Sequence, residues 1–183
     1  MDIDIDFADR QTVLEKIKNV PARIKTRKHN TGVYCHRVPV DPLSGMCTLD
    51  HKEAESAGYF KLDLLNVGIY KDVKSNDHLM ELMEREPMWE LLQYQEFADQ
   101  VFHISGHVEL LRKLKPQNAE QLAAVLAIIR PSKRWLANES WDVIDREVWK
   151  KPANDDYYFK KAHAISYAIA VIVHMNLLCE QLG

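Results

Sequence analysis

The chain has 183 residues, of which 46% are hydrophobic and 28% are charged, and its formal net charge is −3. These values are typical of an ordinary globular chain with one domain, or one domain and a smaller lobe, and the net charge does not by itself indicate nucleic-acid binding. The three cysteines lack metal-binding spacing and no signal peptide is apparent, so we expect free thiols in a reducing cytoplasm rather than a secreted, disulfide-linked fold.

The chain begins MDIDIDF, in which Asp2, Asp4 and Asp6 alternate with Ile3, Ile5 and Phe7. This alternation predicts a strand whose apolar side chains face a core and whose carboxylates share the other face, roughly 6–7 Å apart. Aspartate is a poor strand former and like charges repel, so a divalent cation would relieve the cost. The alternative is a frayed, solvated, acidic N-terminus.

After this strand, Asp9 is placed to cap a short helix over residues 10–20, which Pro21 would end. Residues 16–37 contain seven Lys or Arg and no acidic residue. This segment is either a solvated basic surface or a phosphate-binding strip. Within it, residues 32–36 predict a strand, and the residues from 39 to 45 predict a turn region.

A second strand is predicted over residues 59–65, where Lys61 and Asp63 share one face. Two carboxylates from the first strand and Asp63 from this one could hold two metal ions for phosphoryl transfer. Lys61 would then add positive charge near phosphates. The alternative is a buried Lys–Asp pair without a catalytic role.

Beyond residue 75 the pattern becomes helical, with a period of 3.6 residues. Helices are predicted over residues 77–86, 87–93, 107–114, 119–129, 140–149 and 159–182, with Asn118 and Ser140 as N-caps. The last of these is interrupted by polar residues, so we expect a buried helix and no membrane contact. The order predicts an α+β fold with a β-rich segment over 1–75 and a helical segment over 76–183.

Several stretches, in order, resemble the alpha subunit of bacterial DNA polymerase III, the C family of replicative polymerases. DIDIDFADR, KHNTGVY and HKEAESAGYFKLDLLNVGIY are similar to its palm motifs. VFHISGHVELLRKLKP, AVLAIIRPS and FKKAHAISYAIAVIVHMNLL are similar to its fingers segments. The resemblance implies a truncated palm of the polymerase-beta-like nucleotidyltransferase type, with a small mixed sheet, followed by a fingers-like helical part.

The resemblance also implies roles for individual residues. Asp2, Asp4 and Asp63 match the catalytic, metal-binding aspartates, which hold Mg²⁺ or Mn²⁺. The residues expected to bind nucleotide or phosphate are Lys61, Arg130, Lys161, His163 and Tyr167, although a lone histidine such as His163 on an apolar helix is also often a buried core residue. The basic loop residues expected to bind DNA are Arg23, Lys25, Arg27, Lys28 and His29, and the segment 130–134 would add further phosphate contacts.

The implied function is a minimal or split DNA-directed DNA polymerase that uses a DNA primer–template and deoxynucleotide triphosphates in the cytoplasm of a bacterial or virus-infected bacterial cell. The chain departs from the family because it lacks the glycine- and serine-rich triphosphate loop before the first aspartates, and because the Q-L-E-S turn reads His103-Ile104-Ser105-Gly106. A second replication protein chain would supply the missing parts. The alternatives are a non-catalytic palm and fingers remnant that binds DNA or a replisome component, and another metal-dependent phosphoryl transferase such as a nuclease.

Overall fold

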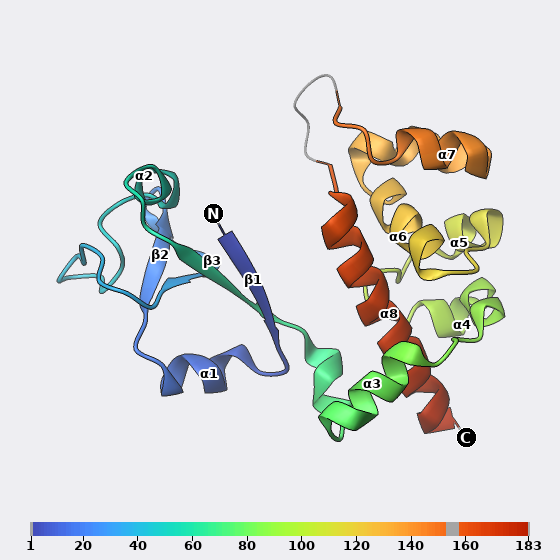
Figure 1. Cartoon of the computed structure of the whole chain (residues 1–183), viewed down its shortest axis with the longest axis horizontal. Helices are drawn as coiled ribbons and strands as arrows, with labels where there is room; N and C mark the ends of the chain where they lie inside the picture. Colours follow the sequence, from blue (N-terminus) through green and yellow to red (C-terminus); the bar gives the residue numbers. More distant parts are fainter. Residues whose placement is uncertain (1, 153–157, 183) are drawn as a thin grey trace. The chain divides into compact units, whose positions relative to one another are not determined.

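The computed structural model describes residues 2–152 and 158–182, with the backbone alone at Asp2. The chain divides into two compact units, Met1–Asp72 and Val73–Gly183. The boundary lies three residues before the one expected from the sequence. Figure 1 shows a sheet with short helices in the first unit and a helical second unit. The expected α+β class with a small mixed sheet is confirmed.

The first unit is built on a four-stranded sheet in the order β1-β4-β3-β2. Strand β4 pairs parallel with β1 and antiparallel with β3, and β3 pairs antiparallel with β2. The strands and helices of this unit are β1 (Asp2–Phe7), α1 (Arg10–Lys16), β2 (Val20–Ile24), β3 (Arg27–Tyr34), α2 (His51–Ser56), β4 (Lys61–Asn66) and the 3₁₀ helix η1 (Gly68–Asp72).

Several boundaries in this unit differ from the sequence prediction, including that of the strand predicted over 59–65, which is β4 at Lys61–Asn66. Asp9 caps α1 as expected, but the helix ends at Lys16, and Pro21 lies inside the unpredicted strand β2. Proline is tolerated there because β2 is an edge strand, where a missing N–H costs no ladder hydrogen bond. The predicted strand over 32–36 is the end of a longer strand, β3.

The apolar face of β1 is less buried than the alternation predicts. Ile3 is 43% exposed, and Ile5 and Phe7 are half-buried. Strand β1 is the other edge of the sheet and has a single neighbour, so its side chains are covered from one side only. The large apolar side chains buried most deeply in this sheet lie on the central strands, at Val33, Tyr34 and Leu64, and the small Ala22 of β2 is buried with them.

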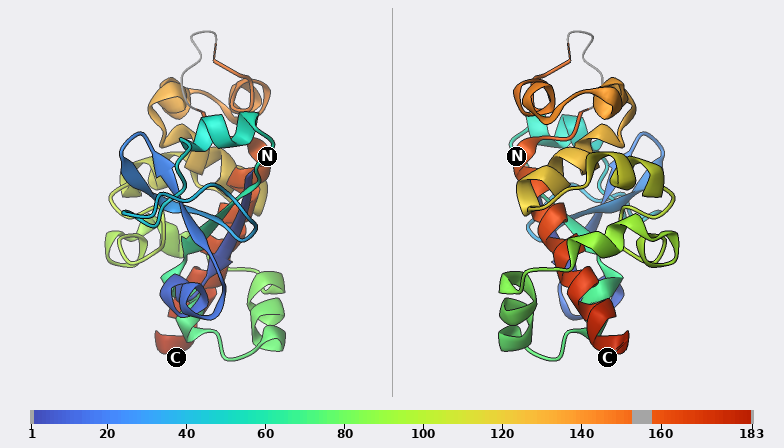
Figure 2. Two further views of the ribbon diagram at one scale, coloured as in Figure 1. Left: turned by 90° about the vertical axis from the view of Figure 1, so that its left-hand side faces the viewer. Right: turned by 90° about the vertical axis from the view of Figure 1, so that its right-hand side faces the viewer.

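The second unit packs around the long helix α8, which contacts α6 and α3 and runs along the unit in both views of Figure 2. Its elements are α3 (Asn76–Glu84), η2 (Trp89–Gln93), α4 (Gln95–Ala98), α5 (Val108–Leu114), α6 (Ala119–Ile128), η3 (Pro131–Asn138), α7 (Trp141–Glu147) and α8 (Lys161–Leu182). Asn118 caps α6 with its side chain as predicted. Ser140 occupies the N-cap position of α7 without a side-chain cap bond.

Helix α8 is the helix within residues 2–152 and 158–182 that is long and apolar enough to cross a membrane, and half of its most apolar stretch is buried. Its polar residues have partners within the unit. Asn176 donates to the carbonyls of Leu82 and Arg85 at 2.9 Å, and His174 accepts from the N–H of Phe102 at 2.9 Å. These bonds favour the expected reading of α8 as a core helix.

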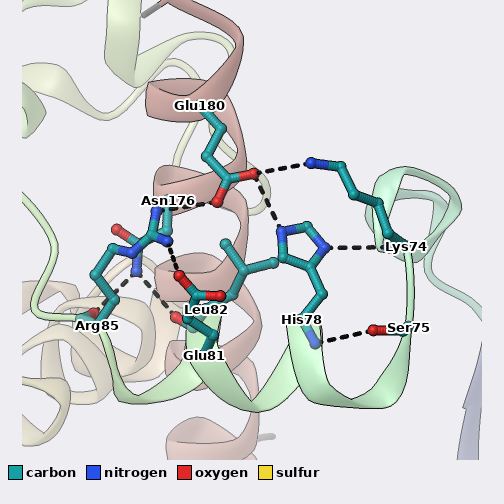
Figure 3. A network of polar contacts seen from close by, with 8 residues as sticks. All are labelled: Lys74, Ser75, His78, Glu81, Leu82, Arg85, Asn176 and Glu180. Carbon is teal, nitrogen blue, oxygen red and sulfur yellow. Dashed lines mark hydrogen bonds and ion pairs between the residues drawn. The ribbon is translucent and has the colours of Figure 1, made fainter.

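A polar network ties α3 to the end of α8 (Figure 3). Glu180 accepts from His78 at 3.1 Å and from Arg85 at 3.0 Å. The amide of Lys74 donates to the other ring nitrogen of His78, which assigns the proton to the nitrogen facing Glu180. Burial raises the pKa of Glu180, but these hydrogen bonds outweigh it and the net pKa is lowered.

Candidate functional site

The sheet topology brings two of the three predicted catalytic aspartates together. In the parallel pairing of β1 with β4, Asp4 lies opposite Asp63. Register partners in neighbouring strands point to the same face, about 4.8 Å apart at the backbone. Asp2 lies opposite Lys61 in the same register, but its side chain lies outside the described residues. The face expected to carry carboxylates therefore carries at least Asp4 and Asp63 side by side.

Asp63 is 8% exposed and its carboxylate is held by several groups. The ammonium of Lys61 donates to Oδ2, and the Thr31 hydroxyl donates to Oδ1 at 2.7 Å. Burial raises the pKa of Asp63, but the bonds from Lys61 and Thr31 and the charge of Lys61 outweigh it, so the net pKa is lowered. Asp63 is therefore ionised, oriented and already paired with a cation.

His29 supports this arrangement from the second strand of the hairpin. Its Nδ1 lies 3.8 Å from Oδ1 of Asp63, and it accepts the N–H of Gly32 at 2.9 Å. A protonated His29 would lower the pKa of Asp63 further, but accepting from Gly32 requires an unprotonated Nδ1, so we treat the ring as neutral. The ring also meets His51, the first residue of α2, edge to face at 5.5 Å.

Gly32 lies opposite Asp63 in the antiparallel pairing of β3 with β4. A Cβ at this position would lie 2.6 Å from Cδ of Lys61 and 3.1 Å from the His29 ring. Such distances are shorter than carbon atoms tolerate, so a glycine is needed for Lys61 to reach Asp63. The KHNTG loop therefore builds the Asp63 site, and the sequence alone gave no geometric reason for its glycine.

Two carboxylates of β1 lie close enough to repel one another. Asp4 and Asp6 are exposed, and the pKa of Asp6 is raised by burial and then by the charge of Asp4. A divalent cation would relieve this repulsion, and paired carboxylates are the donors that Mg²⁺ prefers. Within the described side chains, no group of three His, Cys, Asp or Glu is arranged to hold a metal ion. The donors Asp4 and Asp63 fit such an ion in chemistry, provided that Lys61 moves off Asp63.

The predicted DNA-binding residues lie on the β2–β3 hairpin and its turn. Lys25, Arg27 and Lys28 are exposed, and an open hollow of about 520 Å³ lies at the hairpin tip. Lys25 adopts a left-handed backbone conformation in the turn, with φ of 53°, and its N–H donates to the Asp50 carboxylate. Arg23 is half-buried and donates to the Thr48 carbonyl. Three of the predicted residues thus face solvent. Arg23 instead bonds the hairpin to the segment that precedes α2, and His29 belongs to the Asp63 site.

In the second unit the structure gathers Arg130 and Tyr167 with aromatic residues. The guanidinium of Arg130 lies over the Phe159 ring at 5.3 Å, and that ring lies 5.4 Å from Tyr167. Tyr167 also meets His103 edge to face at 4.6 Å, and His103 has a left-handed φ of 65°. Burial, and then the charge of Arg130, lower the pKa of His103. We call Phe102, His103, Arg130, Phe159 and Tyr167 the aromatic cluster.

Two further predicted residues of this unit, Lys161 and His163, lie in the first turn of α8. Lys161 is exposed and lies 3.4 Å from Glu120. His163 is exposed, so the alternative of a buried core histidine is wrong. Lys133 was expected to contact DNA phosphates as part of segment 130–134. It is 4% exposed and donates to the Glu147 and Lys150 carbonyls, so this expectation is wrong.

The sequence did not single out Thr31 at the Asp63 site, nor Phe102, His103 and Phe159 in the aromatic cluster, as site residues. Thr31 stands where the resembled loop has a small residue, and its hydroxyl, two residues after His29, was the available signal. Comparison with known proteins adds nothing to the assignment: no protein-family model matches the chain, and no curated protein matches it.

Proposed function

We propose that the chain is a minimal or split DNA-directed DNA polymerase, with a truncated palm of the polymerase-beta-like type in the first unit. The observation that carries the proposal is the register of β1 with β4, which sets Asp4 beside Asp63 with Lys61 on the same face. Carboxylates that share one face of a sheet are suitable ligands for the metal ions of two-metal nucleotidyl transfer. The proposed setting is the cytoplasm of a bacterial or virus-infected bacterial cell.

In this proposal Asp2, Asp4 and Asp63 hold Mg²⁺ or Mn²⁺, and these ions, when bound, activate the primer 3′-hydroxyl and neutralise the leaving pyrophosphate. Asp63 accepts a bond from Thr31 that fixes its orientation before any ligand binds. Lys61 moves from Asp63 to a phosphate oxygen, because an ammonium and a metal ion compete for the same carboxylate. Gly32 leaves the space through which that side chain passes.

The second unit supplies nucleotide binding in the proposal. The faces of Phe102, His103 and Tyr167 offer stacking area for a base, and Arg130, Lys161 and His163 offer positive or hydrogen-bonding groups for the triphosphate. Lys25, Arg27 and Lys28 bind primer–template phosphates from the hairpin tip. A second replication protein chain is the protein partner in this proposal.

One observation favours a second candidate, a non-catalytic palm and fingers remnant that binds DNA or a replisome component. Lys61 neutralises Asp63 within the fold, as a structural ion pair would. If the pair is structural, Asp63 needs no metal, and the exposed basic hairpin retains its use in DNA binding. The two candidates differ in whether the carboxylates are required for function.

The test is extension of a labelled primer on a template with four deoxynucleotides and Mg²⁺ or Mn²⁺. The polymerase proposal predicts extension that Asp4→Asn and Asp63→Asn each abolish, while Asp72→Asn, an aspartate outside the sheet, leaves it unchanged. Failure of the folded wild-type protein to extend, combined with unchanged primer–template affinity in both carboxylate variants, would instead establish the binding remnant.

A further inference from the structure

The second unit contains an open cavity of about 510 Å³ that lies between helix α5, the end of α6 and η3. This volume is within the range of pockets that bind small molecules. Its lining combines apolar side chains, including Leu110 and Ile128, with the basic side chains of Lys113 and Arg134. The cavity has no part in the proposed polymerase function.

The two basic side chains are held at the cavity wall. Lys113 donates to the side-chain oxygen of Asn138, which also lines the cavity. Arg134 donates through Nη2 to the Ile129 carbonyl at 3.1 Å. Bonds of this kind fix the direction of long side chains, so less conformational freedom is lost when an anion binds.

The charge balance in the cavity favours an anion. Glu109 is the acidic residue of the lining, and Arg112 neutralises it through a bond of 2.7 Å. His107 is half-buried in the same wall. Burial is the largest cause that lowers the pKa of His107, and the nearby charges of Arg134 and then Arg130 lower it further.

We propose that this cavity binds a small organic phosphate with an apolar or aromatic portion, of which a nucleoside monophosphate is the simplest example. Lys113 and Arg134 hold the phosphate, because charge-assisted hydrogen bonds from ammonium and guanidinium groups suit its oxygens. Leu110 and Ala137 contact the apolar portion, with the buried Ile128 behind them. The basic groups bind the phosphate and the apolar surface binds the other portion, so a ligand with both portions uses the whole cavity.

The test is isothermal titration of the full chain with AMP, adenosine and inorganic phosphate. We expect AMP to bind more tightly than either adenosine or phosphate. Lys113→Gln and Arg134→Gln should each weaken AMP binding by about tenfold, the loss expected from one charge-assisted bond. Lys115→Gln removes one positive charge next to α5 without touching the lining and should leave the affinity unchanged.

A further variant separates this cavity from the aromatic cluster. Tyr167→Ala removes the base contact proposed for the aromatic cluster, so the inference predicts that AMP binding persists in this variant and that adding Arg134→Gln weakens it about tenfold. Loss of AMP binding in Tyr167→Ala but not in Arg134→Gln would move the ligand to the aromatic cluster and overturn the assignment. AMP binding no tighter than phosphate, or no heat at millimolar AMP, would also overturn it.

Discussion

Replacing Gly32 by alanine should damage the Asp63 site more than any exposed substitution nearby. The new Cβ would lie 2.6 Å from Cδ of Lys61, whereas ordinary contact begins at 3.4 Å, so Cδ must retreat by about 0.8 Å. Lys61 is 5% exposed and holds Asp63, so this retreat also weakens a buried ion pair. Overpacking of this kind costs about 1–3 kcal/mol, and we expect about 2 kcal/mol for local opening of the sheet.

Hydrogen exchange of the β4 amides is the appropriate assay, because the four tryptophans all lie in the second unit and fluorescence would report on that unit. A loss of about 2 kcal/mol corresponds to exchange about 30-fold faster. Gly68→Ala is the matched control, because a Cβ there meets nothing within 4 Å. It should leave protection unchanged or raise it slightly by restricting the unfolded chain.

A double-mutant cycle isolates the cause. In a Lys61→Ala background the clashing Cδ is absent, so Gly32→Ala should cost much less than it does in the wild-type chain. Equal protection of β4 in Gly32→Ala and Gly68→Ala would refute the reasoning. So would a cost that persists fully when Lys61 is removed, because the strain would then come from another contact.

Three other perturbations test separate parts of the structure. Asn176→Leu should destabilise the second unit by about 2 kcal/mol in urea unfolding, because the carbonyls of Leu82 and Arg85 lose their donor. The exposed Gln181→Leu on the same helix should change stability little. Equal unfolding midpoints for the two variants would contradict the role of the Asn176 amide. Because the pKa of Asp63 is lowered, its ion pair contributes its full stability above about pH 4 and loses it as the pH falls further. Asp63→Asn should therefore lose less stability than the wild type on acidification. Parallel stability profiles of the two proteins in acid would argue against the pair. Lys28→Gln should reduce the slope of log affinity for primer–template against log salt concentration by about 0.9, as expected for the loss of one phosphate contact. Lys71→Gln should not change this slope. An unchanged slope in Lys28→Gln would remove the hairpin tip from the DNA interface.

The alternating aspartates were sufficient to predict a strand, and the KLD stretch a second strand with Lys61 and Asp63 on one face. Their adjacency follows from the parallel pairing of β1 with β4, which sequence periodicity does not encode. The sequence does not predict β2, because Pro21 indicates a helix end, and proline is compatible with both a helix boundary and an edge strand. The antiparallel pairing of β2 with β3 shows that Pro21 lies in an edge strand.

In the helical unit the periodicity predicted most of the helices, and the caps at Asn118 and Ser140 placed two of their starts. The aromatic cluster could not be assembled from the sequence, because its members come from segments about 30 residues apart that only folding brings together. Lys133 illustrates the reverse failure. A lysine in a basic run reads as solvated, yet two backbone carbonyls hold it inside the fold.

The central claim is that Asp4 and Asp63 together hold a divalent cation in the presence of a primer–template. Binding of Mn²⁺ to the protein–DNA complex, measured by electron paramagnetic resonance, tests it most directly. The account predicts binding that Asp4→Asn and Asp63→Asn each weaken by at least about tenfold, and that Asp72→Asn leaves unchanged. Equal Mn²⁺ affinity in wild type and in both sheet variants would contradict the claim, and the Lys61–Asp63 pair would then be a structural feature of the fold.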